Sequence, residues 1–140
     1  MTLFELDNHL NNIIRLSDAK EMLLYYESRV LKAVSYQKQR SSSTEVNREP
    51  EQYILLREKQ KAHIAELEEE IKDFEANELL PYLNGIDLKI YLKEYMALYL
   101  RYMCGNKWDA VARAMNIETE AIKKRCYRYL LNHHEDKSSN

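Results

Sequence analysis

The chain has 140 residues, 45% of them hydrophobic, which is enough for one ordinary core or for two small helical lobes joined by a linker. Only 2 Gly and 2 Pro are present, so the tight turns of β-hairpins and short sheet connections are nearly excluded, and an all-α fold is predicted. The 21 basic and 23 acidic residues nearly cancel, so the net charge of −2 neither favours nor excludes a polyanionic partner.

Two further features bear on where the protein works. No stretch of 18 or more apolar residues occurs, and the N-terminus lacks a basic segment followed by an apolar one. We therefore expect a cytoplasmic protein with no membrane partner. Cys104 and Cys126 both lie in segments with helical periodicity, so two buried thiols are expected rather than a disulfide.

Residues 1–80 form the predicted N-terminal helical region. Apolar residues recur at helical spacing from Leu3 to Val34 and predict one amphipathic stripe. Asp18 followed by Glu21 resembles a capping box, which would break the stripe near Ser17 into two helices. The polar run SSSTEVNREP at 41–50 is predicted to be a linker, and the region is thus expected to form a helical hairpin.

The second arm of that hairpin, residues 51–80, is a charged helix with nine acidic and four basic residues, a net charge of −5. The spacing of a coiled-coil seam is shown by Arg57, Gln60, Ile64, Leu67, Ile71 and Phe74. This seam would pair either with the N-terminal helix of its own chain or with a second copy in a homodimer. Pro81 is expected to end the helix.

Residues 81–132 are predicted to form a second domain, followed by a flexible polar tail at 133–140. Leu83, Asn84 and Gly85 supply a turn before a tyrosine-rich helix from about Ile86 to Cys104, and Gly105 fits its C-terminal cap.

Two short helical patterns follow this cap, separated by a brief turn, and together they predict a helix-turn-helix. The first pattern has apolar residues at i, i+3, i+4 and i+7, and the second has them at i, i+4, i+7 and i+8. Ala112 is small enough for the helices to approach closely. The predicted core of the motif consists of Trp108, Val111, Ala112, Met115, Ile117, Ile122, Cys126 and Tyr129.

The opposite face of the second helix, residues 119–131, is polar and largely basic. On this face and nearby, the candidate DNA-binding residues are Lys107, Arg113, Thr119, Glu120, Lys123, Lys124, Tyr127 and Arg128. Residues 105–131 hold six basic and three acidic residues, a net charge of +3, against −5 for residues 51–80. This polarity indicates that one end of the chain faces a polyanion.

The segment LYLRYMCGNKWDAVARAMNIETEAIKKRCYRYLL, Leu98 to Leu131, resembles region 4 of sigma factors. The whole layout resembles phage-encoded transcriptional regulators of the ArpU and RinA kind. The resemblance implies a regulator of phage or prophage genes that binds double-stranded DNA in a bacterial host cell, with RNA polymerase as a further partner.

Carried over by position, the resemblance assigns Thr119, Glu120, Lys123 and Lys124 to base reading. Asn116 stands where the motif usually has glycine, and Asn tolerates the left-handed conformation. Glu118 stands where Ser or Thr usually caps the second helix, so Thr119 is an alternative cap.

Catalytic motifs, cofactor sites and metal sites are not indicated. The sequence has no Gly-rich phosphate loop or nucleophile elbow, and the acidic run ELEEE at 66–70 fits a solvated helix face better than a metal site. We therefore expect a DNA-binding regulator rather than an enzyme. The alternatives are a DNA-packaging subunit of the small-terminase type and a helical module that binds only proteins.

Overall fold

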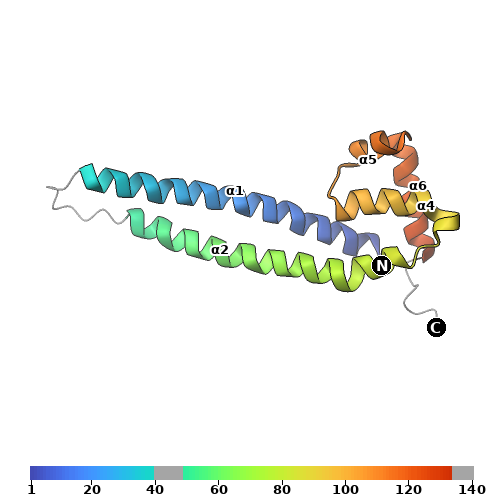
Figure 1. Cartoon of the computed structure of the whole chain (residues 1–140), viewed down its shortest axis with the longest axis horizontal. Coiled ribbons are helices and arrows are strands. Elements are labelled where there is room, and N and C mark those ends of the chain that lie inside the picture. Colours follow the sequence, from blue (N-terminus) through green and yellow to red (C-terminus); the bar gives the residue numbers. More distant parts are fainter. Residues whose placement is uncertain (40–48, 134–140) are drawn as a thin grey trace. The chain divides into compact units, whose positions relative to one another are not determined.

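The computed structural model describes the backbone of residues 1–39 and 49–133 and the side chains of residues 1–32 and 51–133 (Figure 1). Every regular element within these residues is a helix, which confirms the all-α prediction. In chain order they are α1 (Leu3–Gln39), α2 (Glu49–Phe74), η1 (Glu75–Leu79), α3 (Leu80–Asn84), α4 (Leu88–Leu98), η2 (Tyr99–Met103), α5 (Trp108–Met115) and α6 (Thr119–His133). The elements η1 and η2 are π-helical.

Two sequence predictions fall largely outside this description. Most of the predicted linker at 41–50 and all but the first residue of the predicted tail at 133–140 are not among the described residues. The sequence also led us to expect no membrane partner. In the part of the chain that the structure describes, no helix is long and apolar enough to cross a membrane.

The chain divides into two compact units, which we describe separately. Unit 1 comprises Met1–Ile13 and the chain from Glu70 onward, and unit 2 comprises Ile14–Glu69. From the sequence, a domain boundary is predicted at residue 81. In the structure, residues 1–13 and 70–80 belong to the same unit as α4, α5 and α6.

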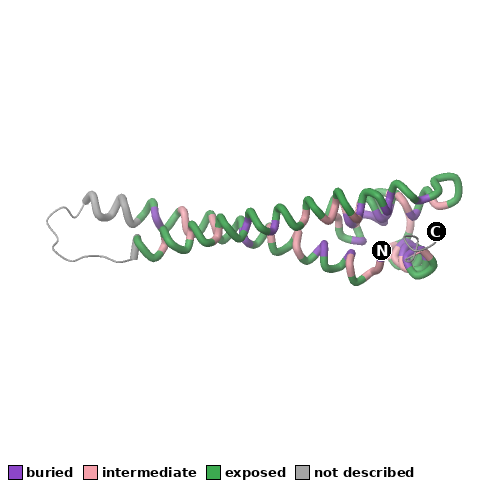
Figure 2. Tube along the Cα trace, turned by 90° about the horizontal axis from the view of Figure 1, so that it is seen from below, coloured by how far each residue is buried: buried purple, intermediate pink, exposed green. Residues whose placement is uncertain are grey.

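Unit 2 is a hairpin made by α1 and α2, whose shared core is small (Figure 2). Ala19 of α1 and Ile64 and Leu67 of α2 are buried, and the Gln60 side-chain amide donates a hydrogen bond of 3.0 Å to the Ala19 carbonyl. The seam residues of α2 therefore pack against α1 of the same chain, one of the two alternatives that the spacing left open.

The predicted break of the first helix near Ser17 is wrong, because α1 is continuous from Leu3 to Gln39. Asp18 and Glu21 are exposed on its surface and do not cap a new helix. Leu16 and Leu23, on either side of Ser17, both pack against the hairpin core. Packing along an amphipathic face outweighs a local capping preference, so the helix continues.

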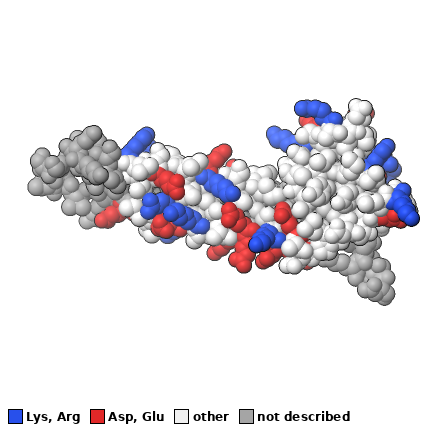
Figure 3. Space-filling view, in the orientation of Figure 1, with Lys and Arg blue, Asp and Glu red and all other residues white. Residues whose placement is uncertain are grey.

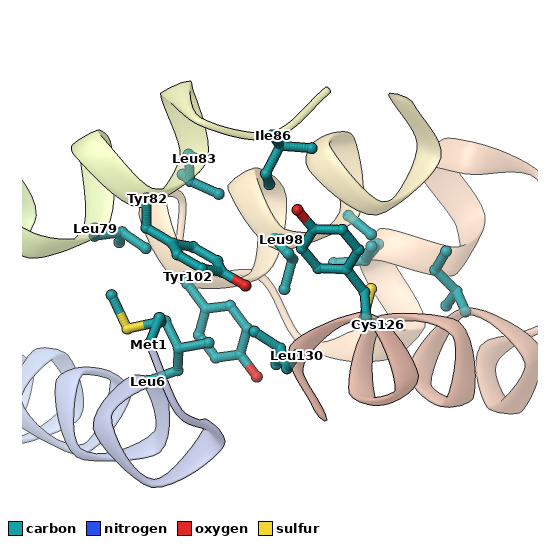
Figure 4. Packing of buried hydrophobic residues seen from close by; sticks show 14 of the residues in the cluster. Met1, Leu6, Leu79, Tyr82, Leu83, Ile86, Leu98, Tyr102, Cys126 and Leu130 are labelled. Carbon is teal, nitrogen blue, oxygen red and sulfur yellow. The ribbon is translucent and has the colours of Figure 1, made fainter. Parts of the chain in front are cut away.

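The core of unit 1 combines side chains from both ends of the chain (Figure 4). Leu6 of α1 and Leu79 of η1 lie in one buried cluster with Tyr102 of η2 and Leu130 of α6, which explains why residues 1–13 belong here. The other buried members are Met1, Leu10, Tyr82, Leu83, Ile86, Ala97, Leu98, Trp108, Val111, Ala112, Ile122, Cys126 and Tyr129.

His9 adds a polar link within this core. Its side chain is 1% exposed, and Nε2 lies 3.1 Å from the Tyr102 carbonyl and 3.3 Å from the Glu75 carboxylate. Since both partners are acceptors, Nε2 carries the proton and donates. Burial lowers the pKa of His9, and the nearby Glu75 carboxylate only partly offsets this effect. A neutral imidazole thus ties α1 to η2.

Pro81 does not end the helix, contrary to the prediction, because α3 continues through it to Asn84. A proline removes one backbone hydrogen bond and its ring crowds the carbonyl four residues earlier. That carbonyl, of Asn77, lies in the π-helical turn Glu75–Leu79, where the hydrogen-bond ladder already departs from the α pattern. The chain turns instead at Gly85, whose N–H bonds to the Pro81 and Tyr82 carbonyls.

The tyrosine-rich helix begins at Leu88, where the Asp87 side chain accepts a hydrogen bond of 3.0 Å from the Lys89 N–H. It is kinked at Tyr91 (φ −120°, ψ 34°) and then continues through η2 to Met103. Cys126 is buried as predicted, but the prediction was wrong for Cys104, which is exposed. Cys104 follows the last turn of η2, next to Gly105, and that position carries it out of the core.

Candidate nucleic-acid interface

The approach to α5 is held by a glycine cap and an arginine. Gly105 adopts φ 73°, and the Asn106 N–H bonds to the Leu100 carbonyl at 3.1 Å, so the preceding helix ends in a left-handed cap. The Arg101 guanidinium donates to the Asn106 carbonyl at 2.9 Å and lies 5.3 Å from the centre of the Trp108 ring. These contacts fix where α5 begins.

The predicted core of the helix-turn-helix lies at the packed face of α5 and α6. Met115 and Ile117 are half-buried against the cluster. Six side chains are buried, namely Trp108, Val111, Ala112, Ile122, Cys126 and Tyr129. Ala112 has almost no exposed surface, and a larger side chain there would push the two helices apart.

The turn between α5 and α6 closes through Asn116, which adopts the left-handed conformation (φ 55°, ψ 44°). Its N–H bonds to the Arg113 carbonyl at 3.3 Å, and the Ile117 N–H bonds to the Ala112 carbonyl at 3.0 Å. This pair of bonds is a Schellman motif, which satisfies the last carbonyls of α5 and redirects the chain. Asn116 therefore takes the role that glycine usually has.

The first turn of α6 is tied to α5 by a side-chain hydrogen bond. The Thr119 hydroxyl donates to the Asp109 carboxylate at 3.1 Å, and the Ile122 N–H bonds to the Glu118 carbonyl at 3.0 Å. Glu118 itself is exposed at the helix N-terminus, where a negative charge is favourable. Thr119 thus links the two helices through a contact that the sequence analysis did not foresee.

The predicted DNA-binding residues differ in how far they are exposed and in whether they already have partners within the protein. Thr119, Lys123 and Tyr127 are partly buried. Lys123 Nζ lies 3.8 Å from Glu120 Oε1, and the Tyr127 ring lies 5.9 Å from the Trp108 ring, edge to face. Lys123 is therefore already partly neutralised, and Tyr127 contributes to packing.

Four cations remain on this surface without an ion-pair partner among the residues that the structure describes. Lys107, Arg113, Lys124 and Arg128 are exposed, and Figure 3 shows Lys and Arg side chains on the surface of unit 1. Asp109 and Glu118 line the hollow at the corner of the two helices, beside Arg113. Near the turn these two carboxylates partly cancel the positive charge, so the positive surface is strongest along α6.

Arg125 was counted among the positive charges of this segment, but the structure gives it another partner. It forms an ion pair with Glu94 of α4, whose side chain is 6% exposed, while that of Arg125 is 47% exposed. Both oxygens of Glu94 are thus inside the protein, and Oε2 has no hydrogen-bond partner in the described part of the chain. The sequence held one signal of this buried ion pair, namely a charged residue, Glu94, within an apolar helix pattern.

The Cys126 thiol lies beside this pair and is chemically quiet. Its pKa is raised to about 12, mainly by burial; the Glu94 carboxylate also raises it, and Arg125 offsets part of that effect. Among the side chains that the structure describes, residues 1–32 and 51–133, no three His, Cys, Asp or Glu side chains come together in a way that could hold a metal ion.

Comparison with known proteins adds no relative. The chain matches no protein-family model, no curated protein and no solved structure.

Proposed function

We propose that this chain is a sequence-specific double-stranded DNA-binding protein that regulates transcription, with α6 as the helix that reads the major groove. The observation that carries the proposal is the arrangement of α5 and α6. A short helix, a three-residue turn at 116–118 and a second helix pack through one buried face, and the opposite face of α6 stays polar. This arrangement is how a helix-turn-helix presents a recognition helix.

Within this proposal the residues of the surface divide into two roles. Thr119, Glu120 and Lys123 lie in the first turns of α6, the part of a recognition helix that reaches base edges. Lys107, Arg113 and Arg128 are exposed cations and are assigned to phosphates, which supply most of the binding energy but no sequence information. The resemblance implies base reading for Lys124, but we assign it to phosphate as well, because it is exposed and has no ion-pair partner among the described residues.

The phage context rests on the resemblance of Leu98–Leu131 to region 4 of sigma factors and of the layout to ArpU and RinA regulators. We accordingly propose phage or prophage genes as the target, acted on in the cytoplasm of a bacterial host. The same resemblance makes RNA polymerase a candidate partner, which a two-hybrid assay against polymerase subunits would test.

The test is a binding measurement with the full chain. A random duplex library at low salt reports any duplex affinity, and repeated selection from it reports sequence preference. We expect Lys124→Ala/Arg128→Ala to weaken duplex binding by about tenfold or more, because two phosphate contacts are lost. Fluorescence anisotropy of labelled duplex gives the affinities.

A matched variant with the same loss of charge is Lys89→Ala/Lys93→Ala, since both lysines are exposed on α4. It should bind duplex DNA nearly as tightly as the natural chain. Equal losses in the two variants would show that net charge alone matters, and no duplex affinity at low salt would refute the proposal. Binding without enrichment of any sequence would remove its sequence-specific part.

A further inference from the structure

Residues 1–13, which we call the N-terminal segment, are held in unit 1 by apolar side chains. Met1, Leu6 and Leu10 are buried in the same cluster as residues of η1, η2 and α6. His9 precedes Leu10 and is buried with it. Histidine is the side chain whose ordinary pKa lies between pH 5 and 8, so the attachment of the segment contains a group that can change its charge in this range.

The His9 ring is enclosed by three other elements of unit 1. It stacks on the Phe74 ring at the end of α2, with 4.8 Å between the two ring centres. Its Nε2 lies 3.3 Å from the carboxylate of Glu75 in η1 and 3.1 Å from the carbonyl of Tyr102 in η2. His9 therefore connects the N-terminal segment to both π-helical turns.

The two nitrogens of the ring have different surroundings. Nε2 faces two acceptors, so it carries the proton of the neutral ring. Nδ1 is buried and has no hydrogen-bond partner among the described residues. A second proton would have to bind Nδ1, where the new N–H would reach neither an acceptor nor water. A buried donor without a partner is costly, and a buried positive charge adds to that cost.

The groups around the ring offset only part of this cost. Among the charged groups of the described residues, Glu75 is the one that acts on His9, and both it and the Tyr102 carbonyl favour a charged ring. Phe74 has no charge, and burial raises the pKa of the Tyr102 phenol, which therefore stays neutral. Burial is the largest effect on His9, and its pKa is lowered from 6.5.

We propose that protonation of His9 releases the N-terminal segment from unit 1, so that His9 acts as a pH-sensitive switch. In the open state the ring is in water and binds a proton with its ordinary affinity, whereas the closed state disfavours the proton. Acid therefore shifts the equilibrium toward the open state. The ratio of open to closed rises by up to about tenfold for each pH unit below 6.5, until the closed state also binds the proton.

Release of the segment has a structural consequence for the rest of unit 1. Leu6 shares one buried cluster with Leu79 of η1, Tyr102 of η2 and Leu130 of α6. When the segment leaves, the apolar surface that Leu6 covers on these elements becomes exposed to solvent. Acid would thus expose apolar surface of the unit that also contains α5 and α6.

Hydrogen exchange of the full chain, followed by mass spectrometry, tests the proposal. Dividing the observed exchange rate of each peptide by its intrinsic rate gives the opening ratio at each pH. Between pH 7.5 and 5.5 this ratio should rise severalfold for residues 3–13, with about tenfold as the limit. An unchanged ratio would refute the switch. Peptides of α6 should open far less than the segment at both pH values, and equal ratios would mean that unit 1 opens as a whole.

A variant that does not titrate locates the effect. His9→Gln keeps an N–H donor for the Tyr102 carbonyl and the Glu75 carboxylate, and its opening ratio should be nearly the same at pH 7.5 and 5.5. His63→Gln is the matched control, because His63 is exposed on α2, and it should keep the full pH response. The same pH response in His9→Gln and in the natural chain would contradict the proposal.

A second variant covers the case in which His9→Gln loosens the segment at every pH. Glu75→Gln keeps an acceptor for Nε2 but removes the charge that favours the protonated ring. The pKa of His9 in the closed state then falls further, so the rise in opening by pH 5.5 should be at least as large as in the natural chain. A smaller rise would show that Glu75 rather than burial controls the response, and would overturn the proposal.

Discussion

At the scale of single residues, Glu94 and Arg125 form an asymmetric ion pair. Glu94 is almost wholly buried on α4, whereas about half of the Arg125 side chain on α6 reaches solvent. Desolvation of a carboxylate is costly, and replacing a buried pair with apolar residues is often neutral or stabilising. We therefore interpret the pair as a device that holds α6 at one rotation against α4 rather than as a main source of stability.

This asymmetry predicts unequal effects of removing either partner. Arg125→Met leaves the Glu94 carboxylate buried without its cation and should lower the free energy of unfolding by about 3 kcal/mol. Glu94→Met leaves Arg125 free to reach water and should cost less than about 1 kcal/mol. Denaturant unfolding followed by Trp108 fluorescence measures both values.

The double variant Glu94→Met/Arg125→Met closes the cycle and should regain most of the stability lost in Arg125→Met. If the two single variants lose the same amount, the pair is not buried in the way the structure indicates. Duplex affinity that falls in the double variant while stability recovers would support the positioning role.

At the scale of elements, the turn at 116–118 sets the angle between α5 and α6. Asn116 is the only non-glycine residue with positive φ among those that the structure describes. The Schellman bonds of this turn depend on that conformation. A side chain that disfavours it changes the angle of α6 and thereby every contact that α6 makes.

We predict that Asn116→Val lowers the free energy of unfolding by about 1–2 kcal/mol, because a β-branched residue pays the full cost of the left-handed conformation. Asn116→Gly should be neutral or slightly stabilising at the same position. Thermal unfolding followed by Trp108 fluorescence distinguishes them. Equal stability of the two variants would mean that the turn adopts another backbone conformation.

At the scale of the whole molecule, charge is distributed unevenly along the chain. The segment 51–80 has a net charge of −5, and 105–131 has +3. Ion pairs reduce what the positive segment can offer a polyanion, since Arg125 pairs with Glu94 and Lys123 with Glu120. Four exposed cations remain, and under the proposed function their number sets the salt dependence of duplex binding.

The proposed interface therefore predicts the slope of log affinity for duplex DNA against log salt concentration. Four phosphate contacts give about −3.6 for one copy, and two copies on one duplex give about −7. Anisotropy titrations at several salt concentrations measure the slope. A slope near zero would contradict phosphate binding.

The sequence by itself determined what depends on local chemistry. Helical spacing located the buried faces of α5 and α6 and the seam of α2, because side-chain direction repeats with the helical period. The shortage of glycine and proline predicted an all-α fold, and the tolerance of Asn for the left-handed region predicted the conformation of Asn116.

Only the tertiary structure decided which partners distant residues find. Packing on α2 kept α1 continuous past Ser17, and the π-turn before Pro81 let the helix run through it. His9 bonds to a carbonyl 93 residues away, and Arg125 pairs across 31 residues. Spacing along one helix reports which face is apolar but not what lies against that face. The exposed cations of the proposed DNA interface were therefore identified only from the fold.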